Sequence, residues 1–140
     1  DVGSRAPLAN SALGRAYLAT VDAATQSSLV DALREAHGSH WPALELGLRR
    51  GHKEHAKHGW CLSIGEFHRE INSVSVAIIH PRGDVMAFNC GGSAFTFSEA
   101  RLRSIVGPAL LAMVKDVGHR VGSQPAVQPT KPTLRKAVAA

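Results

Sequence analysis

Apolar residues recur at helical spacing in the first part of the chain. In a segment over about residues 10–20, Leu13 and Ala16 share one helical face, and Asn10 and Ser11 before them are good helix caps. The spacing therefore favours an amphipathic helix at this position.

Two further helices with clear ends follow. Asp22 can cap the second helix, and Gly38 lies just past its end. The apolar stripe that this helix should bury comprises Leu29, Val30 and Leu33. Pro42 fits the first turn of the third helix, which Gly59 should close. Helices are thus predicted to dominate the first 58 residues.

The pattern then changes from helical to strand-like. The segment Glu70–Ile79, EINSVSVAII, is rich in β-branched residues and partly alternates, as a strand packed on at least one face does. The segment Val85–Cys90 is a second strand, and the turn chemistry of HPRGD between the two predicts an antiparallel hairpin. A shorter strand is predicted at Trp60–Ser63, before a turn at Ile64 and Gly65.

A long closing helix is predicted after Ser98, which can cap it, and Gly107 and Pro108 should bend it. Its apolar positions are Leu102, Ile105, Val106, Leu110, Met113 and Val117. Helices, a hairpin and a closing helix predict the α+β class, with an antiparallel sheet flanked by helices. Two or three strands make a thin sheet, so it either borrows strands from a partner chain or includes strands that precede Asp1.

Composition fits this picture. With 140 residues, 44% hydrophobic and 19% charged, the chain suits one globular domain with a real core. No apolar stretch reaches the roughly 18–20 residues of a membrane span, and the first residues lack a signal-peptide pattern. We therefore expect a soluble, cytoplasmic protein without a membrane partner.

The chain is basic, with a net charge of +5 and a pI near 9.8. Few aromatics accompany the basic residues, so the sequence lacks a stacking platform for single strands, and we interpret the charge as solvated surface. The tail over residues 123–140 is Pro-rich and is predicted to be disordered. The basic residues concerned are Arg49, Arg50, Lys53 and Lys57 on the third helix and Lys131, Arg135 and Lys136 in the tail.

Two catalytic or metal-binding alternatives have some support. His52, His55 and His58 resemble a metal cluster, but residues three apart on a helix diverge by about 60°, so the outer two point about 120° apart. We predict a polar helix face and no metal site, although a pair of them with outside help remains an alternative. A thiol-dependent enzyme would use Cys90, yet nothing local identifies its base. No familiar catalytic motif is present, and we predict no catalytic residues and no cofactor.

Small polar groups on otherwise apolar elements are the stronger signal. Ser73 and Ser75 share one face of their strand by its period of two, and Asn89 interrupts the next strand. A buried hydroxyl or amide requires a partner, which is protein, water or a ligand. The main-chain amides at the start of the first helix form a natural receptor for an anion. Each residue alone is explained by backbone bonding, but together they favour a pocket.

The sequence resembles the C-terminal effector-binding domain of IclR-type bacterial transcription regulators. The similarity is carried by LANSALGRAYLA, LRRGHKEHAKHGWCLSIGE, EINSVSVAII, the PRGDV turn and AFNCGGSAFTFSEARLRSIVGPALLAMVKDV, in the family's order and spacing. The resemblance covers about residues 2–121 and defines a domain over residues 1–122. It implies a GAF-like fold that binds a small organic acid and controls DNA binding through an N-terminal winged helix-turn-helix domain. On this resemblance we expect that domain and the first strands of the sensor domain to precede Asp1, which would account for the thin sheet.

The resemblance also implies ligand-binding positions. Main-chain amides of Ala12 and Leu13 would receive a carboxylate. Ser63 stands where some members have an acidic residue, and Gly91 replaces a hydroxyl-bearing residue of some relatives, which removes a hydrogen bond and should add space. The remaining positions that match pocket walls or ligand contacts are Ile71, Ser73 and Asn89.

The mechanism expected from the resemblance is a population shift in a homodimer or homotetramer, in which the acid binds one arrangement better than another. Two alternatives from other classes remain: the thiol enzyme described above, and an oligomerisation module without a ligand.

Overall fold

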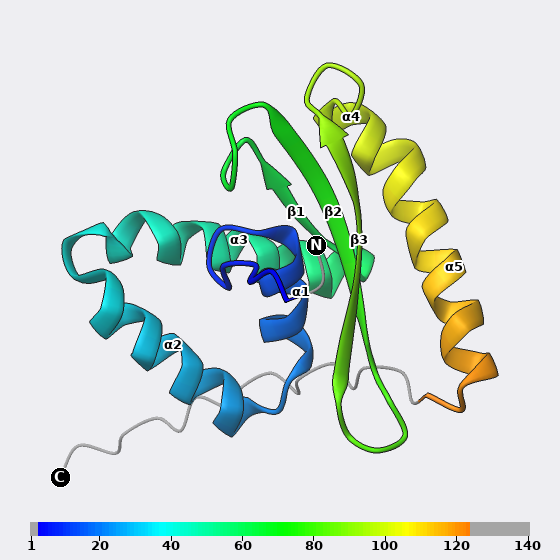
Figure 1. Ribbon diagram of the computed structural model, residues 1–140, viewed down its shortest axis with the longest axis horizontal. Helices are drawn as coiled ribbons and strands as arrows, with labels where there is room; N and C mark the ends of the chain where they lie inside the picture. Colours follow the sequence, from blue (N-terminus) through cyan, green and yellow to red (C-terminus); the bar gives the residue numbers. More distant parts are fainter. Residues whose placement is uncertain (1–2, 124–140) are drawn as a thin grey trace, which may run out of the picture.

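The computed structural model describes residues 3–123, and all but the first residue of the tail predicted to be disordered, 123–140, lies outside them. Helices and an antiparallel sheet make an α+β domain (Figure 1), as the sequence predicts. The helices are α1 (Ala12–Thr20), α2 (Ala23–His37), α3 (Trp41–His58), α4 (Glu99–Arg101) and α5 (Gly107–Arg120), with short segments η1 (Gly38–His40) and η2 (Leu102–Val106). The strands are β1 (Cys61–Ile64), β2 (Ile71–Ile79) and β3 (Val85–Ser93).

Local side-chain chemistry sets the helix ends that the sequence predicts. The Ser11 hydroxyl accepts from the Gly14 amide at 3.0 Å at the start of α1. The Asp22 carboxylate begins α2; hydrogen bonds from Thr25, from its hydroxyl above all, hold the pKa of that carboxyl below its usual range. Gly59 ends α3 at φ 80°, a left-handed conformation that suits glycine, and Ser98 caps α4.

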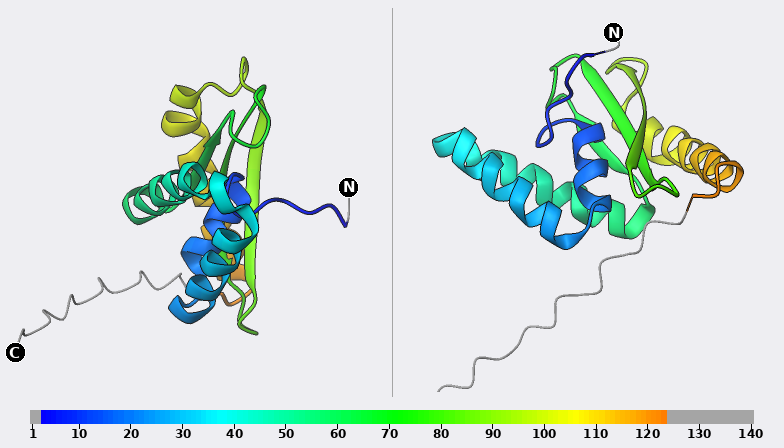
Figure 2. Two further views of the ribbon diagram at one scale, coloured as in Figure 1. Left: turned by 90° about the vertical axis from the view of Figure 1, so that its left-hand side faces the viewer. Right: turned by 60° about the horizontal axis from the view of Figure 1, so that its bottom comes forward.

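The three strands are ordered β1-β2-β3, and both pairings are antiparallel. Because successive side chains alternate across a sheet, each strand presents one set of residues to α1 and the other set to α5. Figure 2 (right) shows the sheet between these two helices. The domain therefore has two layers of helix around a sheet that is, within residues 3–123, three strands wide.

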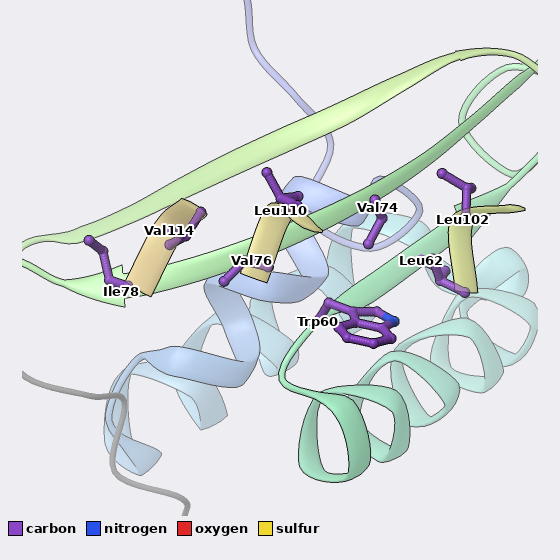
Figure 3. Close-up of a cluster of buried hydrophobic side chains, with 8 residues drawn as sticks. All are labelled: Trp60, Leu62, Val74, Val76, Ile78, Leu102, Leu110 and Val114. Carbon is purple, nitrogen blue, oxygen red and sulfur yellow. The ribbon is translucent and has the colours of Figure 1, made fainter. Parts of the chain in front are cut away.

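The larger core fills the α5 face of the sheet (Figure 3). Val74, Leu102 and Val114 are completely buried there, and Trp60, the residue before β1, belongs to the same cluster. The other face has a smaller cluster of small side chains, which lets α1 approach the strands closely. That cluster consists of Ala16, Ala19, Cys61 and Ala77.

Several details differ from the sequence prediction, among them the start of β2, which is Ile71 instead of Glu70. No residue of α2 is fully buried, so the predicted stripe of Leu29, Val30 and Leu33 is only half-covered. β1 begins and ends one residue later than predicted, and β3 continues past Cys90 to Ser93. Instead of a simple bend before Pro108, the chain forms a π-helical turn in η2, where the Gly107 amide donates to the Leu102 carbonyl.

None of the helices within residues 3–123 combines the length and apolar character needed to cross a membrane.

Candidate functional site

The polar residues singled out from the strands lie on the sheet face that α1 contacts. Ser63 of β1 stands opposite Ser73 of β2, which in turn stands opposite Gly91 of β3. Ser75 and Asn89 form the next pair on the same face. The structure therefore gathers four polar side chains and one glycine from three strands, and it confirms the shared face of Ser73 and Ser75 that the period-two pattern predicts.

Asn89 is held by a direct hydrogen bond to its strand neighbour. The Ser75 hydroxyl, which is completely buried, donates to Asn89 Oδ1 at 2.7 Å. This bond satisfies Ser75 and fixes the amide plane, so that Asn89 Nδ2 has two N–H donors directed away from Ser75. Within residues 3–123 no hydrogen bond uses Nδ2, and Asn89 is exposed. Its amide is an oriented donor at the surface of the sheet.

Ser63 has a structural task at the edge of this face. Its side chain is buried, and its hydroxyl donates to the Asn10 carbonyl at 2.8 Å. The bond ties β1 to the residues that lead into α1. The Ser63 donor is thus committed to the protein, where an acidic residue at the same position would have no proton to give.

The start of α1 supplies two main-chain donors. The Ser11 side chain satisfies the Gly14 amide, whereas the amides of Ala12 and Leu13 have no hydrogen-bond partner within residues 3–123. A Cβ at Gly14 would lie 2.3 Å from the Leu8 Cα, so only glycine lets the chain before α1 fold back against the helix. This close approach places Leu8 directly against the first turn of α1.

An ion pair between the buried Arg15 and the partly exposed Glu66 fixes α1 relative to β1. Arg15 donates from Nε to the Ala9 carbonyl at 3.0 Å and from Nη1 to the Leu62 carbonyl at 2.9 Å and to Glu66 Oε1 at 3.1 Å. Its Nη2 also contacts Glu66 Oε2, and the Arg15 side chain is only 3% exposed. Gly47 of α3 leaves the room that this guanidinium occupies. The pair therefore holds helix, strand and loop in one arrangement.

Asn10 belongs to the site, although the sequence pattern assigns it only a capping role. Ser11 takes that role, and Asn10 Nδ2 donates instead to the Glu66 carbonyl at 3.3 Å. Asn10 Oδ1 is buried and has no hydrogen-bond partner within residues 3–123. It is an acceptor close in the chain to the Ala12 and Leu13 amides. The sequence offers one indication of its role: Asn10 and Ser11 are consecutive cap residues, and a helix uses only one of them as its cap.

The remaining predicted positions define how open the site is. Ile71, the first residue of β2, is 37% exposed, and Asn89 and Gly91 are exposed as well. The polar row, which comprises Ser63, Ser73, Ser75, Asn89 and Gly91, is therefore open on its β3 side within residues 3–123, whereas Ser63 and Ser75 are buried. Gly91 does not add space: a Cβ there would lie 2.5 Å from the Ser73 Cβ and 2.6 Å from the Asn72 carbonyl oxygen. The expectation of added space is wrong, because β2 packs directly against Gly91.

The geometry of the described residues does not support either alternative, the histidine metal site or the Cys90-dependent enzyme. Residues 3–123 contain no group of three histidine, cysteine or acidic side chains arranged to hold a metal ion, and burial with the nearby His52 lowers the pKa of His55. Cys90 is half-buried against the core on the α5 side, and no hydrogen bond within the described residues joins it to a histidine.

The two thiols should differ in reactivity. Burial raises the pKa of the Cys61 thiol to about 12, and this side chain is completely buried. At pH 8 the thiolate of Cys61 is thus a fraction of about one in ten thousand. Iodoacetamide followed by peptide mass spectrometry should modify Cys90 in the native protein and Cys61 only after denaturation. Rapid native labelling of Cys61 would contradict the burial described here.

Comparison with known proteins identifies relatives over most of the chain. The family model of the bacterial transcriptional regulator IclR C-terminal domain matches residues 1–119. The HTH-type transcriptional regulator TsaQ1/TsaQ2 of Comamonas testosteroni is 29% identical over 119 residues, which are 84% of this chain and 42% of that protein. The crystal structure of an IclR family transcriptional regulator from Brucella abortus has a TM-score of 0.80 and 38% identity, and covers 82% of this chain and 44% of that one.

A third similarity concerns the fold alone. The inducer-binding domain of the PobR transcription factor from Acinetobacter, solved as a double mutant in complex with 3-hydroxybenzoic acid, has a TM-score of 0.60 at 19% identity. It covers 82% of this chain and 69% of that one. This chain spans less than half the length of the TsaQ1/TsaQ2 and Brucella proteins.

Proposed function

Since this chain belongs to the IclR family of bacterial transcriptional regulators and matches its C-terminal domain, we propose that it senses a small organic acid at the α1 face of the sheet. The proposal includes a winged helix-turn-helix domain in the full-length regulator, whose DNA binding changes when the acid is bound. The relatives compared above are transcriptional regulators rather than enzymes, which supports a sensing role.

The observation that carries the proposal is a set of unused N–H donors on the α1 face of the sheet. The amides of Ala12 and Leu13 and the Asn89 Nδ2 group all offer N–H groups on one face of the sheet. A carboxylate accepts several such bonds, and the start of a helix adds a favourable dipole. Asn10 Oδ1 provides an acceptor for a hydroxyl on the same ligand.

Two further residues complete the proposed site. Ser73, half-buried between Ser63 and Gly91, offers a hydroxyl in the middle of the polar row. Ile71 supplies an apolar wall for the hydrocarbon part of the acid. The complex of the PobR inducer-binding domain with 3-hydroxybenzoic acid supports the class of ligand, a hydroxylated or plain carboxylic acid.

The proposed response is a shift between two arrangements of a homodimer or homotetramer. A ligand shifts such an equilibrium only by its difference in affinity for the two states. In this chain the acid would connect α1 to β3, two elements that otherwise meet through small side chains. Closing that connection would alter the position of α1, and with it the spacing of the attached DNA-binding domains.

Asn89→Asp is the sharpest test of the site. The carboxylate still accepts from Ser75, so the fold is retained, but the N–H donors are gone and a negative charge faces the ligand. We expect the dissociation constant of an acid bound at this face of the sheet to rise by about tenfold or more, equivalent to about 1.4 kcal/mol. A thermal-shift screen of aliphatic and aromatic carboxylic acids finds the acid, and isothermal titration measures both proteins.

Ser73→Ala should weaken the same acid by a smaller factor, about two- to tenfold, because one neutral hydrogen bond is lost. The neutral amide of the acid provides the control, since Asn89→Asp should hardly change its affinity. If no acid raises the melting temperature, or if Asn89→Asp binds the acid as the parent chain does, the ligand does not use this face.

A further inference from the structure

A groove between α1, α2 and α3 is separate from the sheet face. It has a volume of about 510 Å³ and shares no lining residue with the proposed acid site. Figure 1 shows α2 turning away from α3 beyond their connection, with α1 beside the wide end. We call this feature the basic groove. Its volume lies within the range of about 300–1,000 Å³ that is typical of small-molecule sites.

The floor and walls of the basic groove are apolar. Trp41 is 6% exposed at its base, while Leu46 at its rim is 60% exposed. Val30 contributes from α2, a helix of 15 residues in which no side chain is fully buried. An amphipathic helix gains most of its stability by packing its apolar face, and α2 packs this face only partly. The remaining apolar lining residues are Leu18 and Leu48.

The rim of the basic groove is strongly cationic. Arg49 is paired with Glu45 at 3.0 Å, and Arg50 with Glu66 at 3.3 Å. Lys53 is exposed, lines the groove, and takes part in no ion pair within residues 3–123. Arg15, which is buried and paired, and the imidazole of His52 also line the groove; the single acidic lining residue is Glu45. An anionic ligand therefore finds an uncompensated positive charge beside an apolar slot.

We propose that the basic groove is a second ligand site, which binds an organic anion with an extended apolar body, such as a medium-chain carboxylate. The apolar body lies along Val30, Trp41 and Leu46, and the carboxylate meets Lys53 at the rim. This site would recognise its ligand by the apolar surface area that the ligand buries and by its charge, whereas the sheet face offers oriented N–H donors. The proposal does not depend on the function assigned to the sheet face.

Octanoate is the probe for this site, and the two tryptophans report on it. Trp41 lines the groove, whereas Trp60 lies in the core and does not line it. In a nitrogen-15 labelled sample, octanoate should shift the indole signal of Trp41 in a saturable manner and leave that of Trp60 in place. Acetate, which lacks the apolar body, and 1-octanol, which lacks the charge, should each bind at least about fivefold more weakly.

Matched variants separate the groove from its surroundings. Lys53→Ala should raise the dissociation constant of octanoate by about two- to fivefold, and Lys57→Ala, the same change on the same helix outside the groove, should not. Leu46→Ser should raise it by about three- to tenfold. Ile105→Ser is the control for Leu46→Ser, because both side chains are 60% exposed and Ile105 lies on η2.

Asn89→Asp should leave octanoate binding at the groove unchanged, which keeps this test independent of the acid site on the sheet. The proposal is overturned if octanoate leaves the Trp41 signal in place, or if Lys53→Ala and Lys57→Ala weaken binding equally. It is also overturned if the chain self-associates through Leu46, measured by sedimentation of the parent chain and Leu46→Ser, because the groove then belongs to a second copy.

Discussion

Glu66→Ala is expected to lower the free energy of unfolding by about 3–5 kcal/mol, because it leaves the buried guanidinium of Arg15 without its counter-ion. The remaining acceptors of Arg15, the carbonyls of Ala9 and Leu62, carry no full charge. The loss should appear as a lower urea midpoint with an unchanged slope.

The control for Glu66→Ala is Glu45→Ala, which removes an exposed pair between residues four apart on α3. That change should alter stability by less than about 0.5 kcal/mol. The double variant Arg15→Met/Glu66→Ala should be more stable than the sum of the single changes predicts, since no unpaired charge remains. Equal, small losses for Glu66→Ala and Glu45→Ala would show that the Arg15–Glu66 pair is solvated.

Glu66→Ala should also lower the affinity for an acid that binds at the sheet face. Arg15 fixes α1 against β1, and Glu66 also receives Asn10 through its main-chain carbonyl. Loss of the Glu66 carboxylate weakens these contacts and frees the start of α1. The main-chain amides of Ala12 and Leu13 then lose their fixed position. The affinity for the acid should therefore fall in Glu66→Ala even at temperatures where the protein is folded.

The sequence predicts those parts of the fold that depend on nearby residues. Helix ends at Ser11, Asp22 and Gly59 follow from hydrogen bonds or backbone conformations within a few residues. The shared face of Ser75 and Asn89 follows from the period of a strand and from one short hairpin. For the same reason, the polar residues that the strands contribute to the candidate site could be predicted from the sequence.

Other features depend on what lies far away in the sequence. Arg15 and Glu66 are 51 residues apart, and nothing local indicates that a charged residue on α1 turns inward. The stripe of α2 has the correct spacing, yet spacing gives no information about how completely another element covers it. The space around Gly91 likewise depends on the approach of β2.

Gly91→Ser, which restores the hydroxyl-bearing type of residue that the resemblance suggests, is expected to lower the free energy of unfolding by about 1–3 kcal/mol. The new Cβ would meet the Ser73 Cβ at 2.5 Å and the Asn72 carbonyl at 2.6 Å, and a main-chain atom of the central strand cannot move without disturbing the pairing. Thermal and urea unfolding measure the loss.

Gly118→Ala is the matched control for Gly91→Ser, since its Cβ would make only ordinary contacts, the nearest at 3.5 Å to Ser123 Cβ. In α5 this change should stabilise the protein, by up to about 1 kcal/mol, because alanine favours a helix over glycine. Opposite signs at the two glycines would establish that β2 and β3 are held unusually close where Ser73 faces Gly91. A neutral or stabilising Gly91→Ser would instead show that the strands separate easily there, and that a ligand at the polar row has more room than this arrangement gives it.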